Sequence, residues 1–247
     1  KPADVTPAIY KMAWVNEHEP ELWASADKIV DVHGYLVYCL TGEWNSSVAA
    51  ADSLGLFDIE KLDYSDQLME IAGVKRSQMS NLYQPGDVIG YVKKEVRESW
   101  NISKEIPVIS GLGDGQAAGV GAAAVDPEIA YLNMGTAVNA GVTANEYQYG
   151  QVFRTLAGGI PDTYVLEVLQ SSGAFLTTWF RKEFGNPALN GGPDPELEAV
   201  AAARNVGAGG LVTLPYWNAV QSPYLVPIDR GAVVVWRCTH GRGSMYR

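Results

Sequence analysis

The chain has 247 residues, of which 47% are hydrophobic and 19% charged, and this composition excludes a disordered or fibrous protein. Its 28 acidic residues outnumber its 18 basic ones, giving a net charge of −10. So acidic a surface repels a phosphate backbone, which disfavours nucleic acid as a partner. No apolar run approaches the roughly 18 residues that a membrane span needs, so we expect no membrane partner either.

The cysteines and histidines give no sign of a metal centre or a disulfide framework. Cys39 and Cys238 lie far apart in the sequence and have no metal-type spacing. His18, His33 and His240 show no paired spacing, and we expect them at the surface or at helix ends. Two unpaired cysteines favour a cytoplasmic protein.

The first third of the chain predicts packed helices followed by a strand. Residues 8–43 read as helical, with Pro20 in the first turn of a second helix and Gly42 as a C-terminal stop. The apolar residues that recur three and four apart here are Met12, Val15, Ile29, Val32, Tyr35, Leu36 and Cys39. A short helix or two is expected within 58–74, and a Pro-Gly turn with an alternating strand within 81–92.

The middle of the chain predicts strands joined by glycine-rich turns. Residues 106–110 (IPVIS) read as a short buried strand, and a glycine-rich turn then feeds a helix of very small residues. Residues 129–134 and 140–143 read as a hairpin. A glycine-rich turn therefore follows a strand twice, as two similar domains facing each other across a cleft would produce.

The last part of the chain alternates strands and helices. Two strands are expected within 152–170, an amphipathic helix over 171–184, a helix over 195–205, and strands at 210–214 and 230–236. Hairpins followed by helices predict a mixed-sheet α/β fold rather than a plain doubly wound one.

Asp114 is the candidate for chemistry. It lies between Gly113 and Gly115, at the turn from a strand into a helix, where the absence of side chains lets a ligand approach the backbone. The positive end of the helix favours an ionised carboxylate. Such a group can accept the proton of a hydroxyl that attacks phosphorus, and it can help to hold Mg²⁺. The structural alternative is that Asp114 only caps the helix.

Other nucleotide-binding and catalytic patterns fit this segment poorly. Gly113, Gly115 and Gly119 partly match a dinucleotide fingerprint, but Asp114 would repel the pyrophosphate, and the strand ending near Met134 carries no terminal acid for a ribose. The GxxxxGK[ST] and GxSxG patterns are absent.

The second glycine turn suits phosphate binding. Gly135 and Thr136 follow a strand, and Gly141 lies on the return strand. Backbone N–H groups and the Thr136 hydroxyl would face the phosphates. The alternative is that the dipeptide simply makes a turn.

The ordered motifs of the chain resemble the FGGY carbohydrate kinases, and xylulokinases in particular. They are NEHEPELW at 16–23, LTGEW at 40–44, LGLFD at 54–58, PVISGLGDGQAAGVGAA at 107–123, LNMGTA at 132–137, SSGAFLTTWFRKEF at 171–184, GGLVTLPYW at 209–217, SPY at 222–224 and RGAV at 230–233.

The resemblance implies a two-domain, ribonuclease-H-like fold of the actin/hexokinase ATPase type, with both domains incomplete in this chain. It places the end of the sugar-binding domain at residues 1–126 and the start of the nucleotide-binding domain at 127–247. Asp114 would be the general base and a Mg²⁺ ligand, and it would bind the sugar together with Gly113 and Gly115.

The other half of the implied site serves the nucleotide. Gly135, Thr136 and Gly173 would contact ATP. The implied activity is ATP- and Mg²⁺-dependent phosphorylation of a sugar or polyol, most nearly a ketopentose such as xylulose. A homodimer is a further expectation.

Departures from the family pattern keep two alternatives open. Ala137 replaces a hydroxyl residue, and residues 218–223 read NAVQSP in place of NGER followed by Ser or Thr and Pro. These changes permit a non-catalytic carbohydrate-binding or regulatory protein on the same scaffold. The chain also reads as the middle of a longer kinase, so a third expectation is an incomplete fold with unpaired strand edges.

Overall fold

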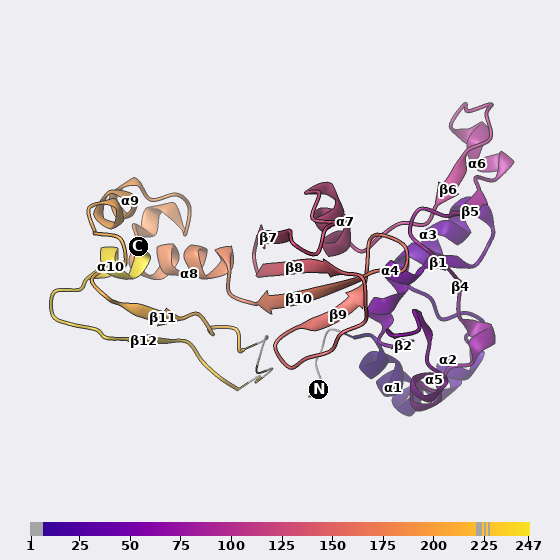
Figure 1. Ribbon diagram of the computed structural model, residues 1–247, viewed down its shortest axis with the longest axis horizontal. Helices are drawn as coiled ribbons and strands as arrows, with labels where there is room; N and C mark the ends of the chain where they lie inside the picture. Colours follow the sequence, from indigo (N-terminus) through magenta and orange to yellow (C-terminus); the bar gives the residue numbers. More distant parts are fainter. Residues whose placement is uncertain (1–6, 221–223, 225, 227) are drawn as a thin grey trace.

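The computed structural model describes residues 7–220, 224, 226 and 228–247, and they form an elongated molecule of three parts (Figure 1). The N-terminal helices lie at one end, a four-stranded sheet occupies the middle, and a second group of helices with a β-ribbon lies at the other end. The Ser222 and Pro223 positions of the SPY motif lie outside the described residues.

The N-terminal part is mostly helical and contains the larger hydrophobic core. Its helices are α1 (Ile9–His18), α2 (Pro20–Ser25), α3 (Val32–Thr41), α4 (Val48–Ala51), α5 (Asp66–Ala72) and α6 (Lys94–Ser99), with 3-10 turns at Asp52–Leu54 and Arg76–Gln78. The core gathers around Leu56, which is fully buried. Pro20 opens α2, and Gly42 ends α3 in the left-handed conformation, as the sequence predicted.

Short strands connect these helices. They are β1 (Asn45–Ser47), β2 (Phe57–Asp58), β3 (Asp63–Tyr64), β4 (Asn81–Tyr83), β5 (Val88–Tyr91) and β6 (Pro107–Ile109). The pairs β1–β4, β2–β3 and β5–β6 each form a separate two-stranded ladder, the first of them parallel.

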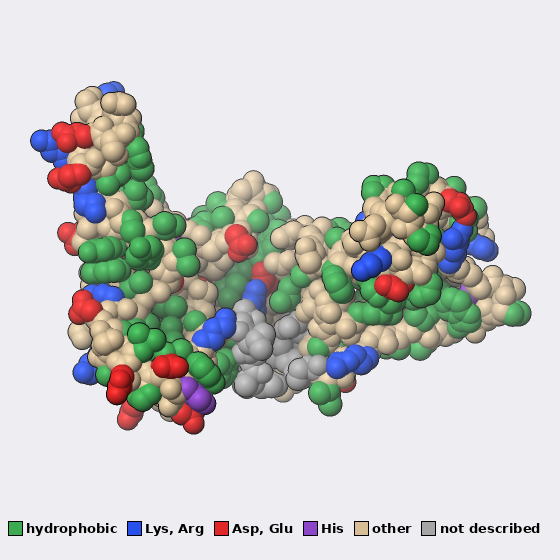
Figure 2. All heavy atoms as spheres, turned by 180° about the vertical axis from the view of Figure 1, so that it is seen from behind, with side chains coloured by type: hydrophobic (Ala, Val, Ile, Leu, Met, Phe, Trp, Pro, Cys, Tyr) green, Lys and Arg blue, Asp and Glu red, His purple; other side chains and the backbone are tan. Residues whose placement is uncertain are grey.

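Apolar residues of this part are exposed in two places. In α3, Val32 is 76% exposed, whereas Val37 and Gly34 are buried. The strand β6 was expected to be buried, yet Ile109 is 48% exposed because, among the described strands, β6 pairs only with β5. Figure 2 shows hydrophobic side chains along this arm of the molecule.

The central sheet is antiparallel, in the order β7-β8-β10-β9. Its strands are β7 (Ala130–Met134), β8 (Val138–Ala144), β9 (Arg154–Ala157) and β10 (Tyr164–Gln170). The helix α7 (Asp114–Gly121) lies against one face (Figure 1), where the ring of Tyr131 packs on Gly119. The predicted hairpin and the two later strands are therefore confirmed.

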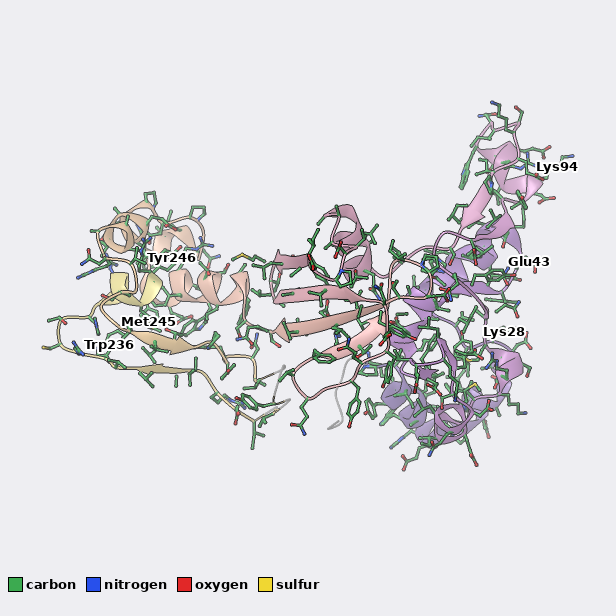
Figure 3. All side chains as sticks on the ribbon, viewed as in Figure 1. Lys28, Glu43, Lys94, Trp236, Met245 and Tyr246 are labelled. Carbon is green, nitrogen blue, oxygen red and sulfur yellow. The ribbon has the colours of Figure 1, made fainter. Side chains whose placement is uncertain are left out.

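The C-terminal part packs three helices beside a β-ribbon. It contains α8 (Ala174–Phe184), a 3-10 turn at Pro187–Leu189, α9 (Pro195–Ala202), α10 (Arg242–Tyr246), and the paired strands β11 (Val212–Leu214) and β12 (Ala232–Val234). Tyr246 lies beside these helices (Figure 3), stacking on Phe180 and donating a hydrogen bond to Glu198 at 2.6 Å. No helix that the structure describes is both long and apolar enough to span a bilayer.

Candidate functional site

Asp114 is the first residue of α7 and is exposed. The N-cap position belongs to Gly113, which has extended backbone angles, so Asp114 does not occupy the position that the capping alternative assumed. Its Oδ1 atom accepts a hydrogen bond from the backbone N–H of Gly115 at 2.9 Å. One N–H of the first turn is thereby satisfied, and the positive end of the helix lies at the carboxylate.

The turn before α7 is anchored to α4 and to the sheet. The Gly113 N–H donates to the Ala49 carbonyl at 2.9 Å. The buried side chain of Gln116 donates both to Ala49 (3.3 Å) and to the carbonyl of Ala157 on β9 (3.4 Å). Residues from α4, α7 and β9 therefore meet at one side-chain amide, which ties the Asp114 turn to both neighbouring parts of the molecule.

The two glycines that flank Asp114 have different surroundings. A Cβ atom at Gly113 would lie 2.6 Å from Gln116 Oε1, so a larger residue there would displace the side-chain amide that anchors the turn. A Cβ atom at Gly115 would meet only Glu167 Oε1, at 3.6 Å, which is an ordinary contact. Packing therefore explains Gly113, whereas the described neighbours leave room for a methyl group at Gly115.

A histidine that the sequence did not single out holds the start of the same turn. The N–H of Gly111 donates to Nε2 of His33 at 3.1 Å, which requires that nitrogen to be unprotonated. Nδ1 of His33 lies 3.2 Å from Ser46 Oγ, and this hydroxyl donates to Asp31 at 2.8 Å. Burial lowers the pKa of His33, with the Asp31 charge acting in the opposite direction, so the neutral form suits this network.

The three residues predicted to contact a nucleotide lie together. The Gly173 N–H donates to the Thr136 carbonyl at 3.0 Å, and the Ala174 N–H donates to the Gly135 carbonyl at 2.9 Å. A Cβ atom at Gly173 would lie 2.7 Å from the Gly135 oxygen, so only glycine fits there. The start of α8 thus fixes the 135–137 turn, with the Thr136 side chain at an exposed position.

The two described cavities lie away from the predicted site residues, and possible metal ligands do not cluster in the described part of the chain. One cavity of about 580 Å³ is lined by residues that include Asp63, Arg76 and Asp87, and one of about 370 Å³ by residues that include Val142 and Leu166. Neither is lined by a predicted site residue. Within the described part of the chain, no three His, Cys, Asp or Glu side chains gather where they could hold a metal ion.

Comparison with known proteins finds a protein family that matches the first half of the chain. Residues 2–121 match the family model described as "FGGY family of carbohydrate kinases, N-terminal domain". The first half of the chain thus matches this family, in agreement with the resemblance of its ordered motifs.

Individual relatives show the same relationship over nearly the whole chain. It is 29% identical to the xylulose kinase of Escherichia coli (strain K12) over 242 residues, which cover 96% of this chain and 48% of the relative. It is also 29% identical to the glycerol kinase of Thermococcus onnurineus, over 90% of this chain and 46% of the relative. The chain thus spans about half the length of the curated relatives it matches.

A solved structure agrees with the fold. The ligand-bound xylulose kinase of Lactobacillus acidophilus superposes with a TM-score of 0.86 at 23% identity, covering 98% of this chain and 49% of that one. The chain therefore has the actin/hexokinase-type α/β fold that the resemblance implied.

Proposed function

We propose that the protein phosphorylates a hydroxyl group of a sugar or polyol with ATP, and that the acceptor is a ketopentose of the xylulose class. The family match over residues 2–121 is the observation that carries this proposal. The two most informative relatives are named for xylulose and for glycerol, so a polyhydroxylated acceptor is common to both.

Asp114 would be the general base. It is exposed, it stands at the positive end of α7, and its turn is fixed by the Gly113–Ala49 hydrogen bond. An ionised carboxylate held in this way can accept the proton of a sugar hydroxyl as its oxygen attacks the γ-phosphorus. The sugar would approach the exposed side of Asp114, next to the backbone of Gly113 and Gly115.

The 135–137 turn would meet the phosphates of ATP. The first N–H groups of α8 are already bonded to the carbonyls of Gly135 and Thr136, so their role is to fix the turn rather than to bind an anion. The exposed Thr136 hydroxyl is then the side-chain donor for a phosphate oxygen. Gly173 would act by allowing the close approach of α8.

Mg²⁺ would enter with the nucleotide. Mg²⁺ sites commonly combine one or two carboxylates with substrate phosphates and water, and Asp114 supplies one exposed carboxylate. The ion would neutralise charge on the transferred phosphoryl group. The division into a sugar-binding part at 1–126 and a nucleotide-binding part at 127–247 belongs to the same proposal, as do a cytoplasmic location and a homodimer.

A coupled assay of ADP release by the complete gene product tests the activity. With Mg²⁺-ATP and a panel of ketopentoses, aldonates and glycerol, we expect turnover with a ketopentose. The alternative, a carbohydrate-binding protein without catalysis, is favoured by the missing hydroxyl at Ala137. That alternative predicts no ADP with any acceptor, and a melting temperature raised by the sugar but not by Mg²⁺-ATP.

A further inference from the structure

A buried carboxylate lies behind the Asp114 turn. Glu167, in the middle of β10, is only 1% exposed. Its Oε1 atom lies 3.6 Å from the position of a Cβ atom at Gly115, and apart from the neighbouring backbone of α7 no other atom of the described residues lies within 4 Å of that position. The carboxylate of Glu167 therefore lies next to the first turn of α7, the helix that begins with Asp114.

The same carboxylate is bonded to three other strands of the sheet. Oε1 accepts hydrogen bonds from the Tyr131 hydroxyl on β7 (3.0 Å) and from the Asn139 amide on β8 (3.3 Å). Oε2 accepts from Nε of Arg154 on β9 at 2.6 Å and also pairs with Nη2 of that residue. All four strands of the central sheet thus converge on one buried charge.

Two of these partners flank the proposed phosphate-binding turn. Tyr131 and Asn139 lie on the two strands that the 135–137 turn connects, and their Cα partners across the ladder are Gly141 and Asn133. The Tyr131 ring also packs on Gly119 of α7, where a Cβ atom would lie 3.1 Å away. Glu167 and Tyr131 therefore bridge the sheet that carries the turn and the helix that carries Asp114.

We propose that Glu167 is a positioning residue that sets the Asp114 carboxylate and the 135–137 turn in register for phosphoryl transfer. This inference rests on the proposed function for its effect on turnover, whereas its structural part stands without it. Phosphoryl transfer depends on alignment, because a displacement of about 1 Å can cost about 10²-fold in rate. A buried charge with geometrically fixed partners is suited to hold such an alignment, since Glu167 itself is only 1% exposed.

The first test is Glu167→Gln in the complete gene product, which keeps the volume and removes the charge. We expect kcat per folded molecule to fall by about 10- to 100-fold while KM for the sugar stays within about 2-fold, since the residue does not contact the sugar. Asp63→Asn is the matched control, because Asp63 also pairs with an arginine (Arg76, 2.6 Å) but at an exposed site. The control should leave kcat unchanged.

A milder variant covers the case in which Glu167→Gln does not fold. Tyr131→Phe with Asn139→Ala removes two of the hydrogen bonds and leaves the Glu167–Arg154 pair intact. A fall of about 5-fold or more in kcat at unchanged KM supports the proposal. A kcat equal to that of the unsubstituted enzyme in the folded variants overturns it, even if the melting temperature falls.

Hydrogen exchange separates this inference from the proposed function. In Glu167→Gln, or in the milder double variant, the amides of 114–117 and 135–138 should exchange at least about 10-fold faster than in the control, without any substrate. Faster exchange in a protein that phosphorylates no acceptor would uphold the positioning role and refute the kinase activity. Unchanged exchange in both segments would refute the positioning role, whatever the activity.

Discussion

Replacing the aspartate at position 52 by asparagine should stabilise the protein at neutral pH. Asp52 follows α4, and its Oδ2 atom accepts the Ala157 N–H of β9 at 3.0 Å. Burial raises the pKa of this carboxyl from 3.8 to about 6, against the opposing effects of that hydrogen bond and of Arg154. Above pH 6 the protein therefore holds a charge in a half-buried, poorly solvated position, whereas the unfolded chain would expose that charge to water.

The size of the effect follows from the pKa shift. Relative to a neutral side chain, the contribution of Asp52 to stability is fully present below pH 3.8 and is lost as the pH rises to about 6. The difference between pKa values of 3.8 and about 6, at 1.36 kcal/mol per pH unit, amounts to about 3 kcal/mol. The amide N–H₂ group that Asp52→Asn introduces costs about 1 kcal/mol if it finds no acceptor, so we expect a net gain of about 2 kcal/mol.

Urea unfolding of Asp52→Asn at pH 4, 5, 6 and 8 measures this gain. The free energy of unfolding should exceed that of the unsubstituted protein by about 2 kcal/mol at pH 8, and near pH 4 it should lie about 1 kcal/mol below it, because only the cost of the unpaired amide remains there. Asp58→Asn is a control of opposite sign, because Lys61 lowers the pKa of Asp58. A gain that is the same at every pH would refute the buried-charge reasoning.

Four further substitutions test the site and the core. Gly173→Ala should destabilise by about 1–3 kcal/mol because its Cβ would lie 2.7 Å from a backbone oxygen, whereas Gly115→Ala should be neutral or stabilise by up to about 1 kcal/mol; equal unfolding midpoints would contradict this. Because the pKa of His33 is lowered, the contribution of this residue to the free energy of unfolding is present above pH 6.5 and is lost as the pH falls. His33→Asn should remove this loss of stability at low pH. An unchanged dependence of the unfolding free energy on pH would count against the Gly111 contact. Leu56→Ala should cost about 2–5 kcal/mol in urea unfolding, and a cost below about 1 kcal/mol would place the core elsewhere.

The local pattern was sufficient to predict the turns and hairpins of the site. Gly113 and Gly135 follow short strands, and β7 through β10 were predicted as strand-like segments separated by turns, because such patterns act over a few residues. The grouping of Gly135, Thr136 and Gly173 was expected from the family resemblance alone, and the structure shows it in the hydrogen bonds at the start of α8.

Partners distant in sequence could not be predicted in this way. His33 and Gly111 are separated by 78 positions, and no spacing rule connects a helix start with a later turn. Glu167 appears as one acid in an apolar strand, and its burial makes sense only once Arg154, Tyr131 and Asn139 surround it. A signal was present, since a charged residue within a buried-type strand demands a partner.

The buried face of α3 could not be identified from its apolar residues for a related reason. Val32, Tyr35 and Leu36 have the spacing of one helix face, yet all three are more than half exposed. The small residue Gly34 takes the inner position instead, because a Cβ atom there would lie 2.8 Å from Ser80 Oγ. The periodicity of apolar residues shows only which face of a helix is hydrophobic, whereas the close approach of α3 to its neighbours requires a small residue at position 34.

The general-base role of Asp114 is tested most directly by the turnover of Asp114→Asn in the complete gene product, with saturating Mg²⁺-ATP and ketopentose. The amide keeps the shape and can still accept the Gly115 N–H, so folding should be preserved while the proton acceptor is lost. Turnover should fall by at least about 10²-fold with little change in the melting temperature. Turnover equal to that of the unsubstituted enzyme would contradict the assignment.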